Sequence, residues 1–485
     1  MDAVTLMRGT PESRGVRSQS IIELLEAFDT EKVELHSLMI ARNGAVIAEG
    51  WWRPYASELK HVLYSLSKSF TSTAAGMLVD EQRLDLDAKV ASFFPEYLPA
   101  SPSELLLRMR VRDLLSMSTG HDQDTLLALV DQEAVPWPQA FLAQPVVHEP
   151  GTHFLYNSGA TYMVSAIVQK ITRETLISYL TPRLFLPLGI EDAEWEVCPQ
   201  GVCTGGWGLS IKTEDILKFG LLYLNKGVWN GKRLLSSEWI KDATSIQISN
   251  GDGGENDWAQ GYGFQFWRCR NNCFRGDGAF GQYCIIMPEE NAVVAITAGQ
   301  GDMQKVLNLI WQHLLPAFEN STIEADLAAN IELSARLAEV TLRYERGAAL
   351  PESPGLQHFG IHVTADNTAG IQHIEFACQS GAIWLTVRDR IGEFVLNIGT
   401  DASWLYGTTR LGAMALVSSH DRRYAATGGW TSPKQFEARV AFIETPYTAT
   451  VKLTLEGDVC SFRYVQNVRF GGDDPSPVTG ILETS

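Results

Sequence analysis

Residues 64–78 of the chain read YSLSKSFTSTAAGML. Apolar side chains recur here at every fourth position, at Leu66, Phe70, Ala74 and Leu78. This spacing predicts an amphipathic helix with one apolar face packed into a core. Ser65 and Lys68 are three residues apart, so a helix would place them on neighbouring turns, with Cβ atoms roughly 5–6 Å apart.

The chemistry of this pair follows from its place at the start of the helix. Unpaired backbone N–H groups and the positive end of the helix dipole would surround the Ser65 hydroxyl. A serine hydroxyl is a poor nucleophile until a base takes its proton, and a lysine shielded from water can be that base. The stretch therefore predicts a nucleophile and its base.

The Ser-x-x-Lys spacing alone is a weak signal. A second copy, Ser57 to Lys60, follows Pro54 without a helical apolar stripe and is interpreted as a loop. The alternative for Ser65 is an ordinary serine at a helix start, with a solvated lysine one turn later. The rest of the chain has to decide between these interpretations.

Composition limits the function classes. The chain has 485 residues, of which 45% are hydrophobic and 20% charged, and this length favours two domains. The net charge of -18 argues against a nucleic-acid or anionic-membrane partner. We expect a cytoplasmic protein, because no signal-peptide core or membrane-length apolar segment is found. We expect the seven cysteines to be reduced, and we predict neither a catalytic metal nor a cofactor.

The first three hundred residues mix strands and helices. Residues 35–42 and 45–50 flank Asn43-Gly44, which predicts a β-hairpin with a type I′ turn. Further strands are predicted at 261–267, 280–286 and 292–298, and a closing helix at 306–315. These strands bracket a helical middle. The predicted class is α+β: an antiparallel sheet flanked by helices, with a helical insert.

The pattern changes in the last third of the chain. We predict a first domain over residues 1–317, a helical segment and Pro/Gly-rich linker over 318–355, and a second domain over 356–485. In this last region short alternating runs are separated by turn residues, at 372–378, 382–387, 393–398, 437–443, 448–455 and 460–465. They predict an all-β sandwich or barrel.

Two further stretches carry chemistry. Tyr156-Asn157-Ser158 leads into a helix predicted from Ala160, and a tyrosine near a lysine can act as a general base. The copy of Tyr-x-Asn at residues 223–225, inside an apolar helix, shows that chance also produces this spacing. Residues 276–282, GDGAFGQ, are predicted to open a strand whose backbone N–H, with that of Ser65, would form an oxyanion hole. The alternative is a plain β-turn. Gly-x-Ser-x-Gly is absent, which disfavours an α/β-hydrolase.

The order of these motifs resembles the serine β-lactamase and penicillin-binding-protein superfamily, and most of all its class C-like branch of esterases, D-aminopeptidases and transacylases. Residues 114–120, LLSMSTG, and residues 208–215 resemble two further segments of that branch. The resemblance covers roughly residues 20–316 and implies a β-lactamase-like fold. It also implies that Ser65 is the acylated nucleophile, that Lys68 and Tyr156 are the base pair, and that the N–H groups of Ser65 and Ala279 form the oxyanion hole.

The sequence departs from the branch at two positions. Ser158 stands where the second motif commonly has Asn, and Gly276 stands where the third motif usually has Lys or His. The cation that would meet a substrate carboxylate is therefore missing, and Asp277 would repel such a group. Arg275, as a strand neighbour of Gly276, is expected to point to the opposite face. This disfavours β-lactamase and carboxypeptidase action.

The sequence thus predicts a serine hydrolase that cleaves a neutral or cationic small-molecule ester or amide through an acyl-enzyme on Ser65. Predicted substrate contacts are Ser158, Asp277, Gly278, Trp207 and Tyr262, with core packing as the alternative for the two aromatic residues. Two alternatives stay open for the whole protein: a D-amino-acid peptidase or weak β-lactamase, and a non-enzymatic binding protein on the same fold. A homo-oligomer is also left open.

Overall fold

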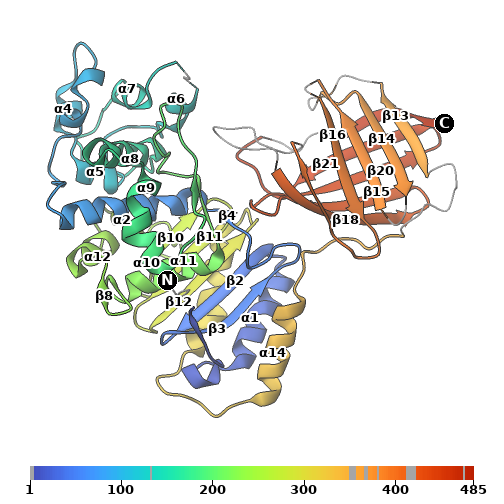
Figure 1. Cartoon of the computed structure of the whole chain (residues 1–485), viewed down its shortest axis with the longest axis horizontal. Helices are drawn as coiled ribbons and strands as arrows, with labels where there is room; N and C mark the ends of the chain where they lie inside the picture. The colour runs from blue at the N-terminus through green and yellow to red at the C-terminus, as the bar shows by residue number, and fades with distance from the viewer. Residues whose placement is uncertain are drawn as a thin grey trace. The chain divides into compact units, whose positions relative to one another are not determined.

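The computed structural model describes residues 5–131, 134–348, 357–364, 367, 370–379, 382–390, 392–410, 422–472 and 476–484. The chain forms two compact units (Figure 1). The first consists of the chain up to Gly50, Ser57–Ala298 and Asp302–Glu339. The second consists of Trp51–Ala56, Gly299–Gly301 and the chain from Val340 onward.

A mixed sheet forms the centre of the first unit, with strand order β1-β3-β2-β12-β11-β10-β9. The predicted hairpin is confirmed, because Asn43 and Gly44 have φ angles of 48° and 76° between β2 and β3. Strand β12 pairs antiparallel with β2 and so joins the two ends of the unit. The strands are β1 (Met7–Arg8), β2 (Leu35–Arg42), β3 (Ala45–Trp51), β9 (Trp267–Arg268), β10 (Phe274–Gly278), β11 (Gln282–Met287) and β12 (Ala292–Ala298).

Helices flank this sheet and form the predicted insert. Helix α11 packs closely on it, because a Cβ at Gly220 would meet side-chain atoms of Val293 and Cys284. The helices are α1 (Ser18–Thr30), α2 (Ser67–Asp80), α3 (Val90–Phe93), α4 (Glu104–Arg108), α5 (Val111–Leu115), α6 (Leu126–Val130), α7 (Trp137–Leu142), α8 (Ser158–Thr172), α9 (Leu176–Leu180), α10 (Leu186–Leu188), α11 (Thr213–Leu224), α12 (Ser237–Thr244), α13 (Met303–Leu309) and α14 (Leu327–Glu339). Small sheets add β4 (His61–Val62) with β6 (Leu209–Ile211) and β5 (Glu194–Trp195), and β7 (Val228–Trp229) with β8 (Lys232–Arg233).

Helix α2 differs from the sequence prediction. Instead of one apolar face, every side from Ser67 to Leu78 is buried. Its hydroxyl groups are satisfied by neighbouring loops: Ser69, Thr71 and Ser72 donate hydrogen bonds to the carbonyl oxygens of Gln265, Gly205 and Phe264. The helix is therefore central, and its polar side chains anchor the loops around it.

Two strand predictions need correction. Residues 261–267 are largely loop, because left-handed conformations at Gly261 and Gln265 interrupt the apparent alternation, and only Trp267 enters β9. The glycine-rich stretch at 276 does not precede a strand but ends one, β10, and residues 279–281 form the turn into β11. The predicted helix at 306–315 begins earlier, at Met303, and its last part has wider π-type turns.

The second unit is an all-β domain, as predicted, and of the two forms it is the barrel. Its strand order is β16-β15-β14-β13-β22-β21-β20-β19-β18-β17, and Gly399 of β16 pairs with Thr427 of β18 to close the sheet. The six predicted strands are present. The strands are β13 (His358–Val363), β14 (His373–Gln379), β15 (Ala382–Arg388), β16 (Glu393–Gly399), β17 (Leu405–Thr409), β18 (Arg422–Ser432), β19 (Gln435–Ala441), β20 (Thr448–Glu456), β21 (Val459–Gln466) and β22 (Val478–Thr484).

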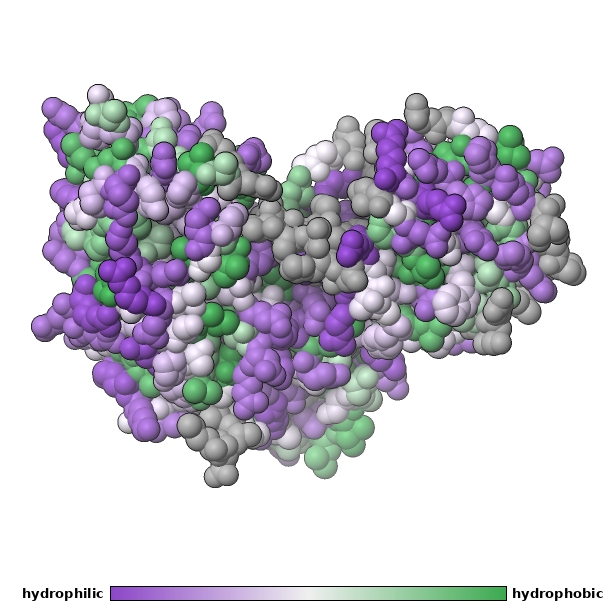
Figure 2. Space-filling view, turned by 45° about the horizontal axis from the view of Figure 1, so that its top comes forward, coloured by the Kyte–Doolittle hydropathy of each residue, from purple (hydrophilic) through white to green (hydrophobic). Residues whose placement is uncertain are grey.

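Helix α14 belongs to the first unit, so the predicted domain limit at residue 317 lies before this helix. Arg336 of α14 forms an ion pair with Glu26 of α1, and the Leu337 side chain packs where Gly50 leaves room. In Figure 2, hydrophilic residues are interspersed with hydrophobic ones on the face shown. Among the helices that the structure describes, none has the length and apolar character needed to cross a membrane.

Candidate active site

Ser65 lies on a 3₁₀ turn, Tyr64–Leu66, that immediately precedes α2. It is therefore held just outside the helix rather than in it. Tyr64 has a φ angle of 46°, a left-handed conformation that costs a non-glycine residue on the order of 1 kcal/mol. The Ser67 hydroxyl accepts a hydrogen bond from the N–H of Leu209 at 3.1 Å, which ties the turn to β6. The nucleophile candidate thus sits on a strained, anchored turn.

Lys68 is almost completely buried beside this serine. Its Nζ lies 3.0 Å from Ser65 Oγ, 3.3 Å from Ser158 Oγ and 2.8 Å from the carbonyl oxygen of Gly206. Burial lowers the pKa of Lys68 to about 8, against the opposing effect of the Asp124 and Asp277 charges. The structure places a lysine that readily loses its proton within hydrogen-bond reach of Ser65.

Tyr156 completes the predicted set. Its ring lies 4.8 Å from Lys68 Nζ and stacks on the indole of Trp267, with ring centroids 5.3 Å apart. Burial raises the pKa of Tyr156, Asp277 raises it further, and a hydrogen bond with Ser65 opposes the shift. The phenol is therefore neutral at ordinary pH and is hydrogen-bonded to the nucleophile candidate.

The end of β10 lies against the Ser65 turn. A Cβ at Gly278 would clash with the carbonyl oxygen of Leu63 and would lie 3.1 Å from the backbone N of Leu66. Only glycine therefore lets the strand come this close. Ala279 follows directly, and its carbonyl oxygen accepts a hydrogen bond from Gln282 at 3.0 Å, which orients this peptide.

We expect Gly278→Ala to lower both turnover and stability, because the added methyl group has to push β10 away from the nucleophile turn. The expected cost is about 1–3 kcal/mol of unfolding free energy, with at least a tenfold lower kcat for a p-nitrophenyl ester if Ser65 is the nucleophile. Thermal unfolding and steady-state kinetics measure the two effects. Gly392→Ala is the matched control, because a Cβ there meets nothing within 4 Å. Unchanged turnover in Gly278→Ala would contradict the close approach.

The structure also explains why a cation is missing at position 276. A Cβ at Gly276 would lie 2.5 Å from Leu66 Cδ1 and from Ser69 Oγ, so any side chain there would require these two residues to shift. Arg275 does not replace that cation. It is fully buried, and its Nε donates to Asp277 Oδ2 at 2.8 Å. The predicted contact residue Asp277 is thus half of a buried ion pair.

Sequence reasoning missed Asp124 and Gly206. Asp124 is exposed, and its Oδ1 accepts a hydrogen bond from the N–H of Ser158 at 2.8 Å. It lies in a loop without a motif, so no spacing could have indicated it. Gly206 contributes only a carbonyl oxygen, which sequence does not encode. Its lack of a side chain is nevertheless needed, since a Cβ there would lie 2.9 Å from the Ser158 carbonyl oxygen.

Trp207 and Tyr262 are both buried. Trp207 is 4% exposed and packs on Trp137, with ring centroids 5.9 Å apart. Tyr262 is 1% exposed and meets Tyr156 edge to face at 6.3 Å. Burial favours core packing for both, although Tyr262 supports the ring of a candidate catalytic residue. Direct substrate contact by these two residues stays a prediction.

The duplicate motifs behave as ordinary structure. Ser57 is exposed, and Lys60 forms an ion pair with Glu194 on the surface. Tyr223 is buried in α11, where its hydroxyl lies 2.8 Å from Thr73 Oγ1. Each is a natural control for its counterpart in the site.

Within the described residues, no group of three or more His, Cys, Asp or Glu side chains is arranged to hold a metal ion. His358 and His362 have the i, i+4 spacing of a helical metal pair. They lie on strand β13, however, where four residues span about 13 Å.

A largely antiparallel sheet flanked by helices, with a Ser-x-x-Lys pair and a tyrosine converging at one strand end, defines a β-lactamase-like class of protein. The profile of the family described as Beta-lactamase matches residues 25–313. The chain belongs to this family, which confirms the resemblance seen in the sequence.

Several of the similar proteins are named as hydrolases. A 6-aminohexanoate-dimer hydrolase from Paenarthrobacter ureafaciens is 25% identical over 307 residues, which are 59% of this chain and 78% of that protein. A D-aminopeptidase from Brucella anthropi is 26% identical over 196 residues, which are 36% of each chain. An octameric penicillin-binding-protein homologue from Pyrococcus abyssi has a TM-score of 0.50 and 16% identity, and covers 92% of this chain and 98% of its own. The last comparison supports the fold of both units.

Proposed function

We propose that this protein is a serine hydrolase that cleaves an ester or amide bond of a small molecule through an acyl-enzyme on Ser65. The observation that carries the proposal is the 3.0 Å contact between Ser65 Oγ and the amine of a lysine that is 1% exposed. An ordinary helix-start serine would have a solvated lysine as its neighbour. The hydrolase relatives support the same reaction class.

The hydrogen bonds of Lys68 suggest how Ser65 is activated. The ammonium form has three N–H donors for three acceptors. When it loses a proton, the two remaining N–H groups keep their bonds to Gly206 and Ser158, and the lone pair faces Ser65. Lys68 then accepts the hydroxyl proton as Ser65 attacks the substrate carbonyl carbon. The neutral phenol of Tyr156 is placed to relay this proton to the leaving group, and the two residues act as one titrating unit.

The developing oxyanion would be held by the N–H groups of Ser65 and Ala279, at the point where β10 meets the nucleophile turn. Collapse of the tetrahedral intermediate breaks the bond to the leaving group, which departs with a proton. Water, activated by the same Lys68–Tyr156 pair, then attacks the acyl-enzyme and releases the acid.

Charges near the site favour neutral or cationic substrates. Position 276 carries no cation and is crowded by Leu66 and Ser69, whereas Asp277 and the exposed Asp124 both act electrostatically on Lys68. Asp124 specifically favours the second candidate, a D-amino-acid peptidase, because an exposed carboxylate at the mouth of the site suits a substrate ammonium group. A homo-oligomer is also part of the proposal, in line with the octameric neighbour.

The proposal is tested by intact-protein mass after exposure to a fluorophosphonate probe. We expect one adduct on the wild type and on Ser57→Ala, and none on Ser65→Ala. An adduct on Ser65→Ala would place the reactive serine elsewhere. No adduct on folded wild type would favour the non-enzymatic binding protein.

The acid side of the pH–rate profile should report Lys68. Only the neutral amine accepts a proton, so kcat/KM for a neutral ester should rise with pH and level off above about 8. Asp124→Asn removes a charge that stabilises the ammonium, so the pKa of Lys68 falls and the rise moves to lower pH. Asp122→Asn, on the same loop and bonded to His148, should leave the profile unchanged. A shift to higher pH in Asp124→Asn would refute this electrostatic coupling.

A further inference from the structure

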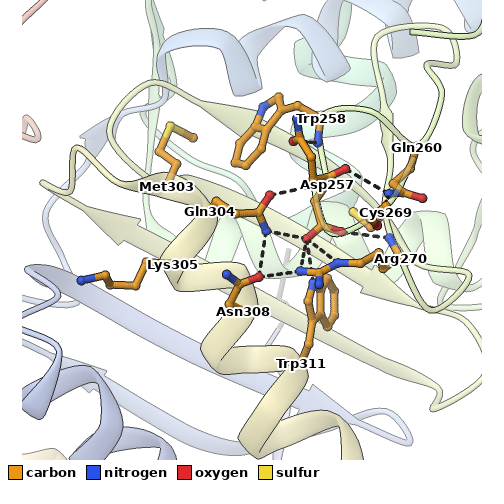
Figure 3. Close-up of polar contacts among 12 residues, drawn as sticks. Asp257, Trp258, Gln260, Cys269, Arg270, Met303, Gln304, Lys305, Asn308 and Trp311 are labelled. Atoms are coloured by element: carbon orange, nitrogen blue, oxygen red, sulfur yellow. Dashed lines mark hydrogen bonds and ion pairs between the residues drawn. The ribbon is translucent and has the colours of Figure 1, made fainter. Parts of the chain in front are cut away.

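A buried acid outside the catalytic set organises the loop between α12 and β9. Asp257 is completely buried, and its Oδ2 accepts hydrogen bonds from Gln304 Nε2 at 2.7 Å, Trp311 Nε1 at 2.9 Å and Arg270 Nη2 at 2.7 Å (Figure 3). Burial alone would raise the pKa of Asp257, but the donors, with Arg270 first, hold it below its ordinary value. The loop is therefore fixed to α13 and the turns that follow it.

This loop holds Arg275 in turn. The carbonyl oxygen of Asp257 accepts a hydrogen bond from Arg275 Nη1 at 2.8 Å. The next residue, Trp258, covers the guanidinium, with 4.3 Å between Cζ and its ring centroid, and Trp267 lies at 5.7 Å. A cation placed between a carbonyl and aromatic faces in a dry interior is strongly held.

Arg275 reaches the active site through Asp277. The two residues are two positions apart on β10, so their side chains share a face of the strand. Trp267 joins this pair to the candidate catalytic tyrosine, because its ring lies 5.7 Å from Arg275 Cζ and stacks on the ring of Tyr156. The ion pair is therefore one aromatic ring away from Tyr156, and the charge of Asp277 raises the pKa of that phenol.

The ion pair matters because Asp277 is nearly inaccessible, with a side-chain exposure of 5%. Burial raises the pKa of Asp277, while Arg275, a hydrogen bond from Trp267 and the charge of Lys68 oppose the shift. A carboxylate buried this deeply without its partner would take up a proton rather than stay charged. The charged and titratable groups around Asp277 are Lys68, Tyr156, Tyr262, Cys269, Arg275 and Tyr283.

We propose that Asp257, Trp258 and Arg275 are positioning residues that keep Asp277 as a charged specificity determinant, so that the site rejects anionic acyl groups. The inference rests on the proposed serine hydrolase function and extends it to residues remote from Ser65. Selectivity for charge would then depend on a network that starts at α13 and ends beside the oxyanion hole.

The test compares two esters with the same leaving group, p-nitrophenyl butyrate and mono-p-nitrophenyl glutarate. The glutarate ester differs by one carboxylate at the end of its acyl chain. The measured quantity is the ratio of kcat/KM, neutral over anionic, between pH 6 and 9. For the wild type we expect a ratio well above one across this range. Asp277→Asn should lower the ratio by at least about tenfold at every pH, because the repelling charge is gone.

Arg275→Met gives the distinguishing result. With its partner removed, Asp277 is protonated at low pH, so the ratio falls there and recovers as rising pH ionises the carboxylate. Arg275→Lys should restore most of the ratio at pH 7, because it keeps a cation. Asp257→Asn should lower the ratio less than Arg275→Met does. Arg268→Met, which loses only surface contacts on β9, is the matched control and should keep the wild-type ratio.

Arg275→Met can fail to fold, because it leaves a buried carboxylate unpaired. The double variant Arg275→Met with Asp277→Asn removes both charges and so leaves no unpaired carboxylate. It should show the low neutral-over-anionic ratio of Asp277→Asn at every pH. A wild-type ratio in Asp277→Asn or in the double variant would overturn the inference. If the wild type hydrolyses neither ester and Ser65 is not labelled, the proposed function fails instead.

Discussion

Ser65→Ala should lose essentially all ester and amide hydrolysis, by a factor of at least about 10³–10⁴ in kcat, because the proposed acyl-enzyme forms on the Ser65 hydroxyl. The side chain is small and sits on a turn whose anchors are backbone contacts and the Ser67 hydroxyl, so folding should be unaffected. Progress curves with p-nitrophenyl esters and D-amino-acid p-nitroanilides measure the loss.

The second copy of the motif supplies the control for this experiment. Ser57→Ala changes the same residue type at the same distance from a lysine, but at an exposed position whose lysine is paired with Glu194. We expect wild-type kinetics for it. Activity of a few per cent or more in purified Ser65→Ala would mean that the 3.0 Å contact to Lys68 is not the reacting pair.

Much of the candidate site was predictable because most of its residues belong to short sequence motifs. Ser65, Lys68, Tyr156 and Ser158 lie within two local stretches, and the family resemblance was enough to bring those stretches together. In the structure Lys68 lies within hydrogen-bond reach of both Ser65 and Ser158. Their catalytic roles stay predictions until tested.

What the sequence did not reveal depends on contacts between distant segments. The spacing of Leu66 and Phe70 indicated a helix correctly, but not that loops would also bury its opposite side. The sequence showed that position 276 lacks a cation, but it did not show that Leu66 and Ser69 crowd this position. Arg275 was expected to point away from the site, and no pattern indicated that it would pair with Asp277.

The barrel shows the same limit. Strand β18 was not predicted, because residues Tyr424 to Trp430 are all buried and so show no alternation, and because Gly428 and Gly429 interrupt the run. A Cβ at Gly428 would lie 2.5 Å from the Glu437 carbonyl oxygen, so the close approach of the neighbouring strand β19 requires glycine at this position. The strands β2 and β12 are also buried at every position, but their runs of aliphatic residues and the Asn43-Gly44 turn made them recognisable, and β18 has neither signal.

Tyr156→Phe is expected to lower the acylation rate by about 10²–10⁴-fold, the usual contribution of a general acid–base group. In the proposed mechanism the phenol relays the proton from Lys68 to the leaving group, and phenylalanine lacks the hydroxyl for this relay while keeping its ring beside Lys68. Stacking on Trp267 depends on the ring alone and persists in phenylalanine. Single-turnover kinetics with a p-nitrophenyl ester measure acylation directly.

Stability separates a catalytic from a structural role for this tyrosine. Tyr156→Phe loses one hydrogen bond, worth about 1 kcal/mol, so the thermal midpoint should shift by only a few degrees. Tyr223→Phe removes a buried hydroxyl that lies 2.8 Å from Thr73 Oγ1, and should shift the midpoint by a similarly small amount while leaving acylation intact. A large drop in the midpoint of Tyr156→Phe, with acylation near wild type in the remaining folded protein, would mark its hydroxyl as structural. Slow acylation by a stable Tyr156→Phe, beside a fully active Tyr223→Phe, would instead tie the phenol to proton transfer.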